Sequence, residues 1–85
     1  MTVQYRIIFY NKLTDQVSGL VSVPGQHLSR VLKMAGIRNS RDLGEHPLDD
    51  QQINAIASII GIRVDPSRFI YHLEPLEPSH EGSRA

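Results

Sequence analysis

What this chain lacks narrows the functions open to it. It contains no cysteine, which excludes disulfides, thiolate metal sites and cysteine nucleophiles together. Nine basic and nine acidic residues cancel, so there is no net field to attract nucleic acid or an anionic membrane. No apolar run approaches about 18 residues, and the N-terminus lacks the basic start and long apolar run of a signal peptide. These absences predict a cytoplasmic protein that does not enter a membrane.

The composition predicts a folded chain with a thin core. Of 85 residues, 40% are hydrophobic and 21% are charged, which is ordinary for a globular protein. Surface scaling gives a folded surface of roughly 5,000 Å² against about 14,000 Å² for the open chain, so about 63% of the surface is buried. We expect one domain over residues 1–74. Residues 75–85 carry few apolar side chains and are expected to form a mobile tail.

Three segments alternate between apolar and polar residues, as half-buried strands do: residues 3–10, 17–23 and 68–74. The first is predicted to be central, because the run from Ile7 to Phe9 has no polar position. Residues 11–16 have the length and composition of a hairpin connection. The side chains expected to face the core are Val3, Tyr5, Ile7, Phe9, Val17, Val21, Val23, Phe69, Tyr71 and Leu73.

Two helices are predicted between the second and third strands. Residues 26–35 carry apolar side chains at helical spacing and end at Gly36. A second helix begins at Asp49, an N-cap residue with Gln52 at the capping-box position, and closes at Gly61. Residues 37–48 are expected to form an irregular loop or a single turn.

These elements predict an α+β fold in the order ββααβ, with both helices packed on one face of a three-stranded sheet. Following the chain up and down through the elements makes the third strand parallel to the first. The expected sheet is therefore mixed, with strand order 2-1-3. Only the C-terminal tail is then left to cover the outer face of the sheet.

Four apolar side chains remain on that outer face: Ile8, Tyr10, Leu20 and Ile70. Together they would expose apolar area on the order of 400 Å², near the upper range for a monomer. We therefore predict a protein-interaction surface, for a homodimer or another protein partner, with Arg6 and His72 as its polar rim. The second strand has no lysine to protect it, so pairing at this edge is a further possibility. The alternative is that scattered exposed hydrophobics are ordinary, and that Arg6, His72 or the tail covers them.

No catalytic motif is present, and we predict a protein that is not an enzyme and has no cofactor. No serine lies in a Gly-x-Ser-x-Gly turn, and the glycines are isolated rather than grouped into a phosphate-binding loop. His46, Asp49 and Asp50 are potential metal ligands, but a helix cap explains Asp49 without a metal, so no metal site is predicted. A third, weaker functional hypothesis is an anion site formed by Arg6, Tyr10 and His72.

Nucleic-acid binding is the second functional hypothesis. Four arginines lie near the ends of the predicted helices and would form a basic rim: Arg38, Arg41, Arg63 and Arg68. The stretch that contains Pro24-Gly25, Leu28, Leu32, Ala35-Gly36-Ile37, Asp42-Leu43 and Ile60-Gly61-Ile62 resembles helix-hairpin-helix modules, which implies contact with a nucleic-acid backbone. The resemblance covers under half of the chain. The second glycine of the hairpin is missing at both Gly25-Gln26-His27 and Gly61-Ile62-Arg63, so capped helices in a neutral domain remain the preferred interpretation.

Overall fold

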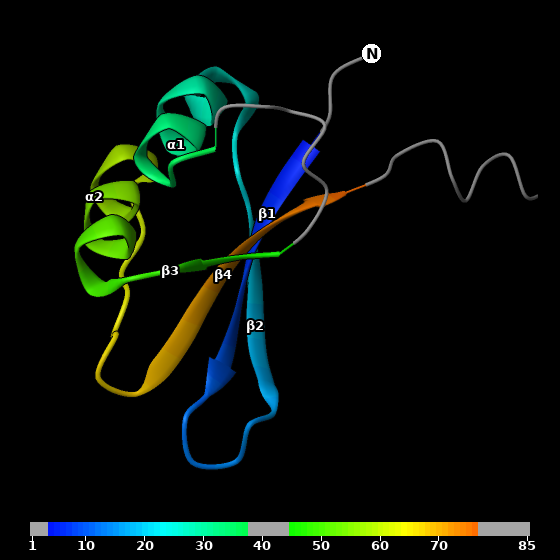
Figure 1. Ribbon diagram of the computed structural model, residues 1–85, viewed down its shortest axis with the longest axis vertical. Helices are drawn as coiled ribbons and strands as arrows, with labels where there is room; N and C mark the ends of the chain where they lie inside the picture. Colours follow the sequence, from blue (N-terminus) through cyan, green and yellow to red (C-terminus); the bar gives the residue numbers. More distant parts are fainter. Residues whose placement is uncertain (1–3, 38–44, 77–85) are drawn as a thin grey trace, which may run out of the picture.

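The computed structural model describes residues 4–37 and 45–76 (Figure 1). Its elements, in chain order, are β1 (Gln4–Asn11), β2 (Val17–Ser22), the 3-10 turn η1 (Gly25–His27), α1 (Leu28–Met34), β3 (His46–Leu48), α2 (Asp50–Ile60) and β4 (Phe69–Leu76). Both helices lie on the same side of the sheet. The predicted α+β class and the two-layer arrangement are therefore confirmed.

Within residues 4–37 and 45–76, the sheet has four strands in the order β2-β1-β4-β3, and every neighbouring pair is antiparallel. The order of the three long strands was predicted correctly, since β4 lies beside β1. The prediction of a mixed three-stranded sheet was wrong. The reason is β3, which adds a fourth strand between the two helices and reverses the direction in which the chain enters β4. The sequence did not predict β3 because its three residues, one of which is Pro47, are too few to show the alternation of a strand.

The core lies between the sheet and the helices. Ile7 and Leu73 are fully buried on the inner face, where Val31 of α1 and Ile53 and Ile56 of α2 pack against the sheet. These helix residues follow the predicted apolar spacing. The apolar stripes of the two helices cover one face of the strands, and neither described helix lies on the other face.

Three aromatic side chains, Phe9, Phe69 and Tyr71, group at one end of the inner face. The Phe9 ring lies 5.3 Å from that of Phe69 and 5.2 Å from that of Tyr71, measured between centroids. Gly19 of β2 pairs with Phe9 and makes room for its ring, because a Cβ atom at Gly19 would lie 2.5 Å from the Phe9 Cζ atom. A glycine here is therefore a packing requirement of the aromatic group.

A β-bulge changes the facing of the first residue of β2. The register runs Phe9 to Gly19 and then Tyr10 to Val17, so Ser18 is the extra residue. Val17 consequently shares the face of Tyr10, and 55% of its surface is exposed. The prediction that Val17 faces the core was wrong, because strict alternation does not allow for an extra residue.

Both ends of α2 follow the sequence prediction. The Asp49 carboxylate accepts a hydrogen bond from the Gln52 backbone N–H at 2.8 Å, and the Gln52 side chain accepts one from the Asp49 N–H at 2.9 Å. Gly61 ends the helix in the left-handed conformation with φ 75°.

β4 runs two residues beyond the predicted domain end at position 74, pairing Pro75 with Tyr5 of β1. Residues 77–85, predicted to be a mobile tail, lie outside the described part.

Candidate functional site: the open sheet face

The side of the sheet opposite the helices carries the candidate site. Neither described helix lies over it (Figure 1). Three cross-strand rows define what we call the open sheet face: Leu20, Ile8 and His72; Val17, Tyr10 and Ile70; and Ser22, Arg6 and Glu74. The residues alternate with the core residues of the same strands, so the pleat that buries Ile7 also directs Ile8 to this face.

The apolar residues of this face differ in exposure. Val17, Leu20 and Ile70 are 55%, 52% and 40% exposed, and they account for three of the five large hydrophobic side chains that are exposed in the described residues. Ile8 is only 8% exposed although it lies outside the helix-side core cluster. The prediction that Ile8 is exposed was wrong, because strands on both sides of β1 shield it. Ile8 is thus buried between more exposed apolar side chains of the same face.

The charged groups of the face are paired within it. Arg6 Nε donates to Glu74 Oε2, in the row next to Ile8. On the β4 side, His72 Nδ1 lies 2.8 Å from Glu45 Oε1, and the Tyr10 hydroxyl donates to Glu45 Oε2 at 3.4 Å. The Tyr10 and His72 rings also meet edge to face, with centroids 5.6 Å apart. Each basic side chain of the rim therefore has a carboxylate beside it.

Glu45 is the residue of this site that sequence reasoning missed. It lies immediately before β3, and the pairing of β3 with β4 brings it to His72. The hydrogen bond to His72 is the main reason why the pKa of Glu45 is lowered, against an opposing effect of desolvation. The pKa of Tyr10 is raised by desolvation first and by the charges of Glu45 and Glu74 next. No local pattern around position 45 signals this long-range contact.

These pairings bear on the anion-site hypothesis. Arg6, Tyr10 and His72 do lie on one face, as predicted. Their donors are directed at the carboxylates of Glu74 and Glu45, which occupy the place that an anionic ligand would take. An anionic ligand would have to displace one of these two carboxylates and lie close to the other, which would repel it. The geometry therefore does not favour an anion site.

Only two of the four arginines that were predicted to form the basic rim fall within the described residues. Arg38 and Arg41 lie outside them, whereas Arg63 and Arg68 are exposed. The Arg68 guanidinium carbon lies 5.7 Å from the centroid of the Phe69 ring. β3 separates the two helices along the chain, so they are not joined as a helix-hairpin-helix module would be. The resemblance to that family therefore does not extend to the connection between the helices.

The three potential metal ligands named from the sequence, His46, Asp49 and Asp50, belong to β3 and to the start of α2. The Asp49 carboxylate caps α2, Asp50 lies in the first turn of that helix, and His46 belongs to β3. Among residues 4–37 and 45–76, no three histidine or acidic side chains are grouped as a metal site would require. Within the same ranges, neither helix is long and apolar enough to cross a membrane.

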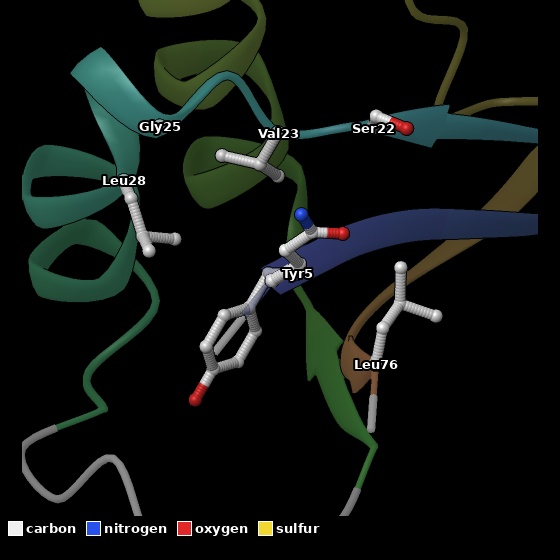
Figure 2. A pocket seen from close by; sticks show the side chains of 7 residues that line it. Tyr5, Ser22, Val23, Gly25, Leu28 and Leu76 are labelled. Atoms are coloured by element: carbon white, nitrogen blue, oxygen red, sulfur yellow. The ribbon is translucent and has the colours of Figure 1, made fainter. Parts of the chain in front are cut away.

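A cavity of about 500 Å³ opens where the start of β1, the end of β2 and α1 meet (Figure 2). Tyr5, Val23, Leu28 and Leu76 give this cavity its apolar lining, and Gln4 and Ser22 add polar groups. Apart from the Tyr5 phenol and the Ser22 hydroxyl, this lining has no titratable or nucleophilic side chain, and it contains no histidine, lysine or acidic residue that would activate either group. We therefore assign no chemistry to this cavity.

Comparison with protein-family models and with curated proteins found no match to this chain.

Proposed function

We propose that this chain is a small cytoplasmic, non-enzymatic interaction module that binds a second copy of itself through the open sheet face. The observation that carries the proposal is the gathering of Val17, Leu20 and Ile70 on one uncovered face, where they are 55%, 52% and 40% exposed. From these fractions their joint exposed area is roughly 250–300 Å², which approaches the size of the largest apolar patch on a typical monomer, and such patches are often functional. This apolar area is smaller than the area that each partner buries in a standard protein–protein interface, about 800 Å². We therefore expect a reversible, concentration-dependent contact.

The charges of the face fit a second copy better than a strongly charged partner. Arg6 with Glu74, and His72 with Glu45, place both signs on the same face. A symmetric dimer brings the same patch together from both subunits, so a patch with charges of one sign would repel itself. Here each carboxylate already lies beside a basic group, which leaves the apolar residues as the main contribution to binding.

The test is the solution mass measured by sedimentation equilibrium over a wide range of protein concentration. Ile70→Glu places a charge on an exposed position of the face, which the fold tolerates because Ile70 is 40% exposed. We expect this variant to have a lower mass than the wild type at equal concentration. Leu13→Glu is the matched control, because Leu13 is 95% exposed in the β1–β2 turn and lies outside the three rows of the face.

Two results would contradict the proposal. If the wild-type mass equals that of one chain at every concentration, self-association is excluded. If both variants lower the mass equally, the open sheet face is excluded as the site of association. If the wild type is a monomer but a co-purifying protein is lost from Ile70→Glu, the face binds a different protein. The nucleic-acid alternative predicts instead a mobility shift that weakens steeply with salt.

A further inference from the structure

The two edges of the sheet are not equally protected. At one edge, β3 has only three residues and contains Pro47, features that block pairing with another strand. At the other edge, β2 has six residues, none of them charged. Proteins usually protect such a strand with lysine, proline or a covering loop. β2 is thus the edge of this sheet that is suited to pairing with another strand.

The direction of the free backbone groups follows from the pairing with β1. The Val23 N–H donates to the Tyr5 carbonyl at 3.0 Å, which marks the first hydrogen-bonded pair. Such pairs alternate with non-bonded pairs along an antiparallel ladder, so Val21 and Gly19 also bond to β1. The N–H and C=O groups of Leu20 and Ser22 therefore point away from β1, toward the free edge.

We propose that β2 pairs antiparallel with β2 of a second copy, about a two-fold axis that places Leu20 opposite its own counterpart. Centring on Leu20 pairs its outward N–H and C=O groups with those of its counterpart, and it places Ser22 of one copy beside the bulge residue Ser18 of the other. A register centred on Val21 would place each Leu20 opposite a Ser22, and one centred on Ser22 would pair Leu20 with Pro24, which has no N–H to donate; centring on Leu20 avoids both. The Leu20 side chains, each 52% exposed, then cover one another on the open face.

Closure of the assembly favours a second copy over an unrelated strand. Two-fold pairing consumes both β2 edges and leaves β3, with its proline, at the two ends of the joined sheet. Association through this edge therefore stops at two chains. This contact goes beyond the proposed function, because it involves the backbone of one strand and leaves Ile70 and the rest of the open sheet face uncovered.

Amide hydrogen exchange followed by NMR tests the edge contact directly. In an isolated copy, the N–H groups of Leu20 and Ser22 exchange freely, whereas that of Val21 is protected by β1. Where about nine-tenths of the chains are paired, we expect the Leu20 and Ser22 amides to exchange about tenfold more slowly, because exchange proceeds from the unpaired tenth. Face-to-face association alone makes no hydrogen bond to these amides, and Ile70→Glu is expected to leave their protection in place.

Two variants complete the test. Ser22→Pro removes an outward N–H without removing a bond to β1, and should abolish protection at Leu20, whereas Ser22→Thr should retain it. Leu20→Cys introduces the single cysteine of the chain, and Cα atoms about 5.5 Å apart in a bonded pair allow a disulfide. Under mild oxidation this variant should form covalent dimers faster than Ser58→Cys on the exposed side of α2. Unprotected Leu20 and Ser22 amides at every concentration, or equal cross-linking of the two cysteine variants, would overturn the inference.

Discussion

Replacing Gly19 with alanine is expected to destabilise the fold by displacing the Phe9 ring. The added Cβ atom would lie 2.5 Å from Cζ and 2.8 Å from Cε1 of Phe9, closer than real Cβ contacts allow. The ring cannot move freely, because it packs between Phe69 and Tyr71 with centroid distances of 5.3 and 5.2 Å. Relief of the clash therefore weakens the aromatic group at this end of the core.

The size of the effect follows from two opposing contributions. Overpacking of a core costs about 1–3 kcal/mol. Alanine also restricts the unfolded chain more than glycine does, which returns roughly 0.4–1 kcal/mol. We expect Gly19→Ala to lower the free energy of unfolding by about 1–2 kcal/mol. For a domain of this size that corresponds to a decrease in Tm of roughly 4–16 °C.

Thermal and urea denaturation followed by circular dichroism measure this change. Gly25→Ala is the matched control, because a Cβ atom at Gly25 meets nothing within 4 Å, and it should be neutral or slightly stabilising. In a Phe9→Leu background the shorter side chain removes the clash, so the cost of Gly19→Ala should fall toward zero. The reasoning is refuted if Gly19→Ala behaves like Gly25→Ala, or if its cost is the same in both backgrounds.

Two further predictions concern the cap of α2 and the rim of the open sheet face. Asp49→Ala should lower the free energy of unfolding by about 1 kcal/mol in urea denaturation, whereas Asp49→Asn should retain most of the stability; equal losses would contradict the capping role. In an NMR titration, the Glu45 carboxyl should titrate below its ordinary pKa of 4.5, and His72→Ala should return it toward that value. Because the folded pKa is lowered, this contact stabilises the fold above the ordinary pKa, and its contribution is lost as the pH falls through the lowered value. The effect on stability should be small because Glu45 is exposed, and an unchanged titration in His72→Ala would exclude the contact.

Local patterns predicted the parts of this fold that depend on local chemistry. The alternation along residues 4–10 identifies a central strand, and the sequence from Asp49 to Gln52 identifies a capping box that the structure contains. The apolar spacing of both helices also corresponds to the residues that pack on the sheet. In each of these segments the residues that decide the conformation lie within one or two turns or within a single strand.

The errors arise where the outcome depends on distant pairing. Pro47 and its two neighbours become a strand only because β4 is present to pair with them, and this added strand reverses the predicted direction of β4. Glu45 reaches His72 through the same pairing, so its role could not be read from nearby residues. The burial of Ile8 likewise depends on strands on both sides of β1. The structure brings all six predicted interface residues to one face, with Ile8 buried there, and their role in binding remains a prediction.

Because of the bulge at Ser18, the side chains that β2 contributes to the open sheet face depend on the number of residues in the β1–β2 hairpin. With strict alternation, Ser18 would lie beside Tyr10 and Val17 would turn to the helix side. A single insertion or deletion in the turn over residues 12–16 could be absorbed by gaining or losing the bulge. Related hairpins of different length could thus exchange a valine for a serine at a contact surface while every side chain of the strand stays the same.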